Sequence, residues 1–304
     1  MTVKTKQATI LHGRELSLTN IDKVLWPEQG YTKGELINYY VEISPYILEH
    51  LKNRPLVITR HPNGINEKSF YQKNAPEYLP EWIKTLPWYS RDSGRYINFI
   101  LVEEAATLAW LANQAGIEMH PWLSQKDSLN YPDFVTFDLD PSPGSTYQDV
   151  IDIALVLKQL LDGLKLRSYV KSSGGEGLHI YLPIINKYTY EEVRNFAQII
   201  AAMITELLPQ IATIERLTNK RGKKVYVDYL QNVLGKTLCS AYSVRPRNNA
   251  PVSAPLFWEE VEKSTSACFN IKNILPRVKE IGDIFAPALT DKQDLAPVLK
   301  KLGQ

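Results

Sequence analysis

The chain has 304 residues and a formal net charge of +2; 44% of its residues are hydrophobic and 22% are charged. This composition is that of an ordinary globular protein and excludes a polycation, so any nucleic-acid binding must depend on a local concentration of basic residues. The length suits one large domain or two lobes that share a cleft.

Two cysteines, Cys239 and Cys268, offer neither a paired framework nor zinc-ligand spacing, which favours a reducing cytosol. The N-terminal residues lack an apolar signal core, and no apolar stretch approaches the roughly 20 residues that a membrane helix needs. We therefore expect a cytoplasmic protein without a membrane segment.

Residues 1–125 predict an N-terminal α/β lobe. Thr32 and Glu35 have capping-box spacing and begin a helical pattern that runs to about Lys52, with an interruption at Pro45. A strand follows at 54–60 (RPLVITR), and residues 99–116 read as a strand that runs into a helix.

Residues 126–260 predict a second lobe with a βαββαβ order of elements. Strands are expected at 134–140, 166–173, 178–184 and 224–230, with helices capped by Ser145 and by Thr189 together with Glu192. Helices on one face of a mainly antiparallel sheet would leave the opposite face to build a site. Residues 261–304 are expected to form a tail that packs back on the body.

Strand alternation places acidic and imidazole side chains on the non-core face of this sheet. Asp138 and Asp140 share one face of their strand, and the same pattern turns His179 and Asp228 away from the core. A solvated strand face is the common explanation for each strand alone, and the segment FDLDPSPG is also typical of a strand that ends in a turn. Together the strands predict a cluster of three carboxylates and a histidine.

Three carboxylates form the hard-oxygen environment that Mg²⁺ or Mn²⁺ prefers, and two such ions can promote an in-line phosphoryl displacement. The turn KSSGGEGLH, residues 171–179, has hydroxyls and backbone amides that could cradle phosphate oxygens, although a plain hairpin turn is the preferred explanation for this segment alone. Lys33 lies in a first helical turn, where the helix dipole disfavours a cation unless an anion binds there too, and Lys23 lies nearby in sequence.

Taken together, these segments resemble a known family. The segments NIDKVLWPEQGYTKGELINYY, FYQKNAP, MHPWLS, FDLDPSPG, SSGGEGLHIY, VYVDYLQN and SAYSVRPR, in this order, resemble the polymerase domain of bacterial ATP-dependent DNA ligase D, in the archaeo-eukaryotic primase superfamily. The resemblance runs from about Leu16 to Leu289. It implies a primase-polymerase fold with two lobes around a cleft, the C-terminal lobe having an RRM-like antiparallel sheet.

The resemblance also implies roles for individual residues. The catalytic and metal-binding residues would be Asp138, Asp140 and Asp228. The nucleotide contacts would be His120, Ser173, His179, Gln231 and Arg245. Contacts to DNA would come from a 5′-phosphate pocket, an aromatic pair and further basic residues: Lys23, Lys33, Arg60, Phe70, Tyr71, Lys220 and Arg221.

The implied function is a template-directed nucleotidyltransferase that fills short gaps at DNA ends in non-homologous end joining. The resemblance implies two Mn²⁺ or Mg²⁺ ions per site, a preference for ribonucleoside triphosphates and action at the nucleoid. It also implies gapped or broken DNA with a 5′-phosphate, a separate DNA ligase and the end-binding protein Ku as partners. A primase that starts chains de novo, a non-catalytic end-binding scaffold and a two-metal nuclease are the alternatives.

One position departs from the family pattern. Glu176 stands where the family often has a basic residue, and a carboxylate beside a triphosphate would repel it, so we expect Glu176 to point away or Lys171 or Lys220 to compensate. No Lys-x-Asp-Gly nucleotidyl-transfer motif occurs, so end sealing is expected from another protein.

Overall fold

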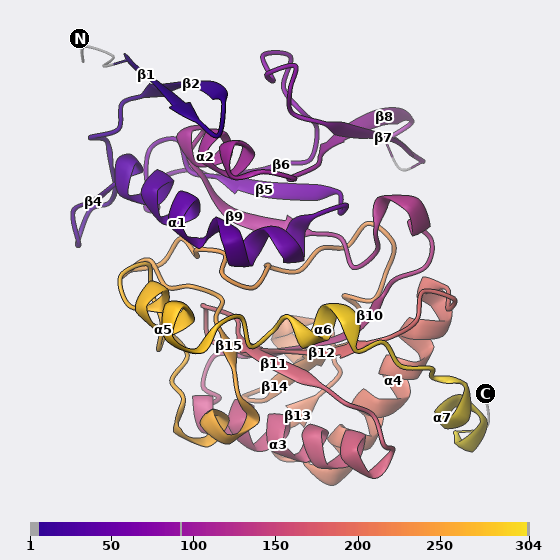
Figure 1. Ribbon diagram of the computed structural model, residues 1–304. Coiled ribbons are helices and arrows are strands. Elements are labelled where there is room, and N and C mark those ends of the chain that lie inside the picture. Colours follow the sequence, from indigo (N-terminus) through magenta and orange to yellow (C-terminus); the bar gives the residue numbers. More distant parts are fainter. Residues whose placement is uncertain (1–5, 92, 303–304) are drawn as a thin grey trace. The chain divides into compact units, whose positions relative to one another are not determined.

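The computed structural model describes residues 6–91 and 93–302, and the chain divides into two compact units. The first unit comprises residues 1–122, 239–253 and 269–282, and the second comprises residues 123–238, 254–268 and 283–304. Helices and mainly antiparallel sheets occur in both (Figure 1), which confirms the predicted α+β class.

The first unit contains small hairpins, a larger antiparallel sheet and helices packed on it (Figure 1). Its strands are β1 (Lys6–Leu11), β2 (Arg14–Thr19), β3 (Val24–Trp26), β4 (Tyr31–Thr32), β5 (Leu56–Arg60), β6 (Phe70–Gln72), β7 (Thr85–Ser90), β8 (Arg95–Ile100) and β9 (Gly116–Pro121). Its helices are α1 (Lys33–Leu51), α2 (Ala105–Asn113) and α5 (Ile274–Ile281). Strand β5 pairs with β6, β8 and β9, and β7 pairs with β8.

Helix α1 continues through Pro45, where the sequence predicted an interruption. The capping box predicted at Thr32 and Glu35 is present at its N-terminus. Proline has no N–H to donate to the carbonyl four residues earlier, which here belongs to Val41. The Ser44 hydroxyl donates to that carbonyl at 2.8 Å, so the acceptor is satisfied and the helix continues to Leu51.

The second unit is built on a sheet with the strand order β13-β14-β10-β12-β11-β15. Its strands are β10 (Phe134–Pro141), β11 (Tyr169–Ser172), β12 (Leu178–Pro183), β13 (Ala212–Thr213), β14 (Val225–Asp228) and β15 (Pro255–Leu256). Its α-helices are α3 (Tyr147–Gly163), α4 (Tyr190–Leu207), α6 (Pro287–Thr290) and α7 (Ala296–Lys301). Short 3-10 turns occur at Lys126–Ser128, Thr218–Lys220 and Trp258–Lys263. All pairings in this sheet are antiparallel except that of β13 with β14.

Helices α3 and α4 lie on the same side of this sheet (Figure 1). Helix α4 begins at the predicted capping box of Thr189 and Glu192. Helix α3 is capped by Thr146, whose side chain accepts from the Asp149 backbone, and the predicted cap at Ser145 is wrong. The Ser145 hydroxyl instead donates to the Ser142 carbonyl at 2.8 Å, which closes the turn before the helix.

The last residues of the chain are divided between the units. Residues 269–282 belong to the first unit and residues 283–304 to the second. In the second unit the ring of Phe285 lies edge-on to the rings of Tyr181 and Tyr169, with centroid separations of 5.4 and 6.2 Å. Tyr181 lies on the same face of β12 as His179, whereas Ile180 lies on the opposite, core face. Phe285 therefore covers part of the sheet face that strand alternation assigned to polar side chains.

No helix within residues 6–91 and 93–302 combines the length and the apolar character that a bilayer-crossing segment requires.

Candidate active site

Neighbouring strands of the second unit place two aspartates directly opposite each other. Asp138 on β10 and Asp228 on β14 are Cα partners in the antiparallel register, so both side chains project from the same face. Asp140 lies two residues beyond Asp138 on β10 and shares that face. The alternating apolar residues Phe137, Leu139 and Val227 are fully buried on the other face. This is the grouping of three carboxylates that strand alternation predicted.

Asp228 is held by three donors. Its Oδ1 accepts from the Tyr226 hydroxyl at 3.0 Å and from the Leu230 backbone at 2.8 Å, and its Oδ2 accepts from Gln231 Nε2 at 3.0 Å. Gln231, predicted as a nucleotide contact, is therefore a direct partner of the carboxylate. The proton that Tyr226 donates is firmly bound, because burial and the adjacent Asp228 both raise the pKa of the phenol.

Asp140 is the most exposed of the three acids and faces Arg221, with 3.6 Å between Oδ2 and Nη1. The Arg221 guanidinium also lies 4.0 Å from the centre of the Tyr226 ring and donates to the carbonyls of Glu215 and Arg216. Partial removal from water raises the pKa of Asp140; Arg221 opposes this, and the charges of Asp228 and Glu176 raise the pKa further. Arg221, predicted as a DNA contact, is thus part of the carboxylate cluster.

The donor set has the chemistry of a magnesium or manganese site, since carboxylate oxygens are the ligands that these ions prefer. Among the residues that the structure describes, no three His, Cys, Asp or Glu side chains are arranged as a ready-made metal site. The carboxylates instead accept from Tyr226, Gln231 and the Leu230 amide, and Asp140 pairs with Arg221. Because Asp228 and Glu176 raise the pKa of Asp140, negative charge is crowded here, and a bound cation would relieve it. The donors therefore fit a divalent ion once their side chains turn toward it.

His179 lies beside the acids on the next strand. It is the register partner of Asp138, and its Nε2 lies 3.4 Å from Asp138 Oδ1. Ser173 is also buried, and its Oγ accepts from the backbone amides of Gly175 and Gly177 at 3.0 and 3.1 Å. Those two amides are therefore engaged within the turn, as in the plain hairpin turn that the sequence indicated as the alternative to a phosphate cradle. The exposed residue of the turn is Glu176.

A second group of predicted residues lies in the first unit around β9. Arg245 Nε lies 3.0 Å from Oε1 of the buried Glu118, and His120 Nε2 lies 3.6 Å from its Oε2. Burial alone would raise the pKa of Glu118, but hydrogen bonding to His120 and the charge of Arg245 lower it to about 2. Glu118 therefore stays ionised and orients both predicted nucleotide contacts.

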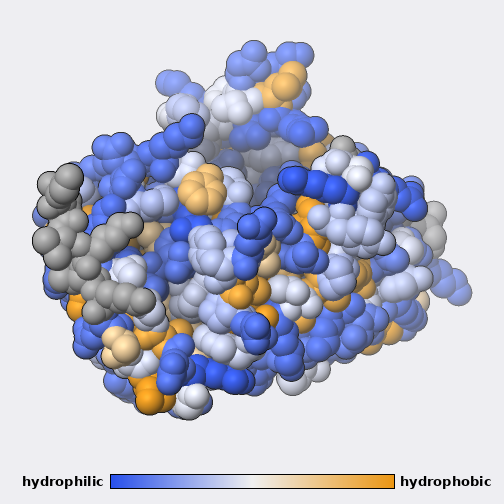
Figure 2. Space-filling view, turned by 90° about the horizontal axis from the view of Figure 1, so that it is seen from above, coloured by the Kyte–Doolittle hydropathy of each residue, from blue (hydrophilic) through white to orange (hydrophobic). Residues whose placement is uncertain are grey.

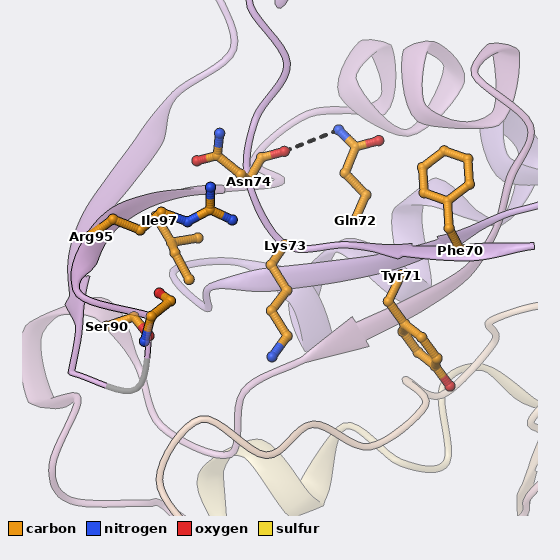
Figure 3. A pocket seen from close by; sticks show the side chains of 9 residues that line it. Phe70, Tyr71, Gln72, Lys73, Asn74, Ser90, Arg95 and Ile97 are labelled. Atoms are coloured by element: carbon orange, nitrogen blue, oxygen red, sulfur yellow. Dashed lines mark hydrogen bonds between the residues drawn. The ribbon is translucent and has the colours of Figure 1, made fainter.

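Phe70 and Tyr71, the predicted aromatic pair, point to opposite sides of β6 (Figure 3). Tyr71 lies 6.1 Å, ring to ring, from His120, while the Phe70 ring lies 5.3 Å from the Arg60 guanidinium. The two aromatics also line a pocket of about 500 Å³ whose other polar and charged residues are Gln72, Lys73, Asn74, Ser90, Ser93 and Arg95. Tyr71 is thus the member of the pair on the side of the predicted nucleotide contacts.

Arg60 is already engaged inside the first unit. Its guanidinium donates to Gln114 O at 2.8 Å, to Gln72 Oε1 at 2.9 Å and to the Tyr78 hydroxyl at 3.1 Å. Nη2 also donates to Gln114 Oε1 at 3.4 Å, so these bonds use four of the five N–H donors and leave one for a DNA contact. The face seen in Figure 2 is mostly hydrophilic. Several of the first unit's exposed large side chains are aromatic, the type that stacks on bases: Phe70, Tyr71, Tyr78, Tyr89 and Tyr96.

The two N-terminal lysines lie close together where α1 begins. Lys33 is buried and donates from Nζ to Asn113 O at 3.0 Å and to Thr19 Oγ1 at 3.2 Å. Burial and the neighbouring charge of Lys23 lower the pKa of Lys33 to about 8. The exposed Lys23 donates to Asn63 Oδ1 at 3.0 Å. Two cations this close to a helix N-terminus are suited to an anion.

The predicted residues therefore fall into two groups, one in each unit. The second unit brings together the acids and three of their predicted neighbours: Asp138, Asp140, His179, Arg221, Gln231 and Asp228. It also contains Ser173 and Lys220. The first unit holds the rest: Lys23, Lys33, Arg60, Phe70, Tyr71, His120 and Arg245. Lys220 is exposed at the end of the 3-10 turn next to Arg221. Sequence reasoning assigned no role to Glu118 or Tyr226, although Glu118 alternates with His120 along β9 and Tyr226 alternates with Asp228 along β14, and this spacing is a detectable signal.

Comparison with known proteins agrees with the resemblance that the sequence motifs indicated. Residues 32–285 match the family described as "LigD, primase-polymerase domain". Among curated proteins, the chain is 37% identical over 293 residues to the bifunctional non-homologous end joining protein LigD of Bacillus subtilis, covering 95% of this chain and 47% of that protein. It is 32% identical to the multifunctional LigD of Mycolicibacterium smegmatis, covering 94% of this chain and 37% of that protein. The chain thus spans less than half the length of these relatives.

A solved structure agrees with the sequence matches. The polymerase domain of Mycobacterium tuberculosis ligase D in complex with DNA superposes with a TM-score of 0.84 at 27% identity, over 91% of this chain and 99% of that one. The α+β fold is thus that of the LigD primase-polymerase domain. This chain belongs to the LigD primase-polymerase domain family.

Proposed function

We propose that this chain is a template-directed nucleotidyltransferase that extends a primer across short gaps at DNA ends during non-homologous end joining. The observation that carries the proposal is the register pair of Asp138 and Asp228, with Asp140 on the same face, in a chain of this family. Gapped DNA with a 5′-phosphate and nucleoside triphosphates are the proposed substrates.

Asp138, Asp140 and Asp228 would hold two Mn²⁺ or Mg²⁺ ions. When bound, such ions promote attack by a hydroxyl on a phosphate and stabilise the leaving oxygen. Before any cation binds, Tyr226 and Gln231 hold Asp228 in a fixed position, and Arg221 balances the charge of Asp140. These bonds keep Asp228 and Asp140 oriented, and they would have to rearrange when a cation binds.

The remaining residues would bind the substrates. His179 and Ser173 would contact the incoming triphosphate, and His120 and Arg245, both oriented by Glu118, would supply further nucleotide contacts. Lys23 and Lys33 would bind the 5′-phosphate downstream of the gap, and Tyr71 would stack on DNA. A preference for ribonucleotides and partnership with a separate DNA ligase and Ku are part of the proposal by virtue of the family.

Primer extension on a gapped duplex tests the proposal. The wild-type protein should add nucleotides, more efficiently with a 5′-phosphate at the gap and with ribonucleotides, in Mn²⁺ or Mg²⁺. Asp138→Asn should reduce extension by at least about 10³-fold while DNA binding is retained, because removing one essential group typically costs this much. The matched control is Asp152→Asn, an exposed aspartate of α3 that accepts from Gln148 and should leave extension unchanged.

A non-catalytic end-binding scaffold is the second candidate, and Glu176 favours it. This carboxylate is exposed in the turn after Ser173 and adds negative charge at Asp140, where a triphosphate would otherwise bind. A scaffold would bind DNA in a manner that depends on the 5′-phosphate and would incorporate no nucleotide in either metal. Wild-type extension at the level of Asp138→Asn would therefore select the scaffold and overturn the polymerase. Product on a template without a primer would instead indicate a primase.

A further inference from the structure

One row of side chains crosses three strands of the second unit. His179 on β12 is the register partner of Asp138 on β10 and also of Lys171 on β11. Register partners in antiparallel strands project from the same face, so the three side chains lie in line. The row therefore joins a proposed metal ligand, a proposed nucleotide contact and a lysine that the proposed function leaves without a role.

Lys171 is fully buried, with 0% exposure. Its Nζ lies 2.6 Å from His179 Nδ1 and 5.7 Å from the centre of the Tyr181 ring. A buried ammonium costs free energy unless it is hydrogen-bonded, and an apolar residue of similar size would fill the position at lower cost. The imidazole and the face of the tyrosine ring both contribute to stabilising the charge.

The direction of this hydrogen bond defines the state of the imidazole. An ammonium has three donors and no acceptor, so His179 Nδ1 must be the acceptor. The ring proton of the neutral imidazole then resides on Nε2, which lies 3.4 Å from Asp138 Oδ1. The other tautomer would direct an N–H against the ammonium.

We propose that Lys171 is a positioning residue that fixes His179 as the neutral Nε2–H tautomer, with this N–H directed to the Asp138 side. His179 then offers a donor of fixed direction to a phosphate oxygen. The inference about the tautomer stands on the row itself, and only its effect on nucleotide binding rests on the proposed function.

Nitrogen-15 NMR of the metal-free protein tests the tautomer directly. In a neutral imidazole the protonated and unprotonated nitrogens have widely separated shifts, and only five histidines contribute to the spectrum. The variant His179→Gln identifies the signals of His179. We expect the wild type to show Nε2 protonated and Nδ1 unprotonated, and Lys171→Met to show a mixture of both tautomers.

The matched control for this measurement is Lys187→Met, which removes an exposed lysine that pairs with Asp294 just after β12. It should leave the His179 signals unchanged. A wild-type spectrum with Nδ1 protonated, or identical His179 signals in the wild type and Lys171→Met, would overturn the proposal. This result does not depend on polymerase activity, so it is separate from the outcome of the extension assay.

A double-mutant cycle tests whether Lys171 acts through His179. Lys171→Met should raise the KM for nucleotide by about tenfold, at the low end of the cost of losing a hydrogen-bonded supporting partner. The double variant with His179→Gln should then be no worse than His179→Gln alone. Additive effects on KM would show that Lys171 acts independently and would overturn the positioning role. Urea unfolding of each variant checks that the unit remains folded.

Discussion

Lys33 shows how a single buried cation can be adapted to a ligand. Its ammonium donates to Asn113 and Thr19, which use two of its three donors. Burial together with the charge of Lys23 makes the protonated form less favourable, and this lowers the pKa to about 8. A phosphate at this position would offset both effects, because it supplies the opposite charge.

This pKa predicts that recognition of the 5′-phosphate weakens in mild alkali. Only the protonated lysine attracts the phosphate, so from pH 7 to pH 9 the affinity advantage of a 5′-phosphate over a 5′-hydroxyl should fall by about tenfold. Fluorescence anisotropy with the two gapped duplexes measures this advantage at each pH. In Lys33→Met the advantage should be small and independent of pH, and a wild-type advantage that stays constant up to pH 9 would contradict the prediction.

The lowered pKa of Lys33 affects stability in the opposite direction: a rise in pH weakens phosphate binding but increases the free energy of unfolding. The folded-state pKa of about 8 is below the ordinary value of 10.5, so between these values the folded protein binds fewer protons than the unfolded chain. The contribution of Lys33 to the free energy of unfolding therefore rises with pH across this window. Loss of phosphate binding above pH 8 is thus not a sign of local unfolding at Lys33.

At the residue scale, the sequence predicted the acids better than their partners. Alternation along single strands was enough to place Asp138, Asp140 and Asp228 on one face. Tyr226 lies two residues before Asp228 on β14, so alternation along that strand alone places the two side chains on one face. Lys171, in contrast, becomes a partner of His179 only through the register between β11 and β12, which no single strand specifies. The engagement of Arg221 with Asp140 depends on how the residues before β14 fold back, and composition alone indicated only a basic run.

Strand β12 begins at a close approach between two backbones. A Cβ on Gly177 would lie 1.9 Å from the Leu139 carbonyl oxygen of β10, a contact that no side chain can make. The glycine therefore has a steric role in bringing β12 against β10, where His179 meets Asp138. The amide of the same residue donates to Ser173 Oγ and closes the turn.

Gly177→Ala should accordingly destabilise the second unit severely. We expect a loss of more than about 3 kcal/mol, because strand separation would break pairing in the middle of the sheet. Gly163→Ala is the matched control: a Cβ added there, at the end of α3, would have no other atom within 4 Å, and alanine favours helix by about 1 kcal/mol. Urea unfolding monitored by circular dichroism measures both. Equal stability of the two variants would contradict the steric argument.

At the element scale, helices were predicted where the capping residues act locally. The boxes at Thr32 and Thr189 depend on residues three positions apart, and both helices begin there. Continuation of α1 through Pro45 depends on a side chain, Ser44, that replaces the missing donor, and periodicity does not reveal such a bond. The cap of α3 lies one residue later than predicted because Ser145 closes the preceding turn.

For the whole molecule, a net charge of +2 means that DNA affinity must come from local contacts and not from a general field. Each phosphate that is neutralised releases counterions, so the number of contacts appears in the salt dependence of binding. Lys220 is exposed and precedes Arg221 in sequence, so it is a candidate for one of these phosphate contacts.

A plot of log affinity against log salt concentration has a negative slope. Lys220→Met should make this slope shallower by about 0.9, the contribution of one phosphate contact on duplex DNA. Lys187→Met, which removes an equally charged but acid-paired lysine, should leave the slope unchanged. Binding titrations between low and moderate salt measure the two slopes. A slope in Lys220→Met equal to that of the wild type would place the phosphate contacts elsewhere.

The division of the chain into units follows an unusual path. The chain passes from one unit to the other after residues 122, 238, 253, 268 and 282. The last segment of the first unit, residues 269–282, is synthesised after most of the second unit, and the last segment of the second unit, residues 283–304, is synthesised after all of the first. The two units therefore cannot fold one after the other during synthesis. For the same reason, cutting the gene after residue 122 would leave the first fragment without residues 239–253 and 269–282 of its own unit, so we expect that fragment to need the second one to complete its core.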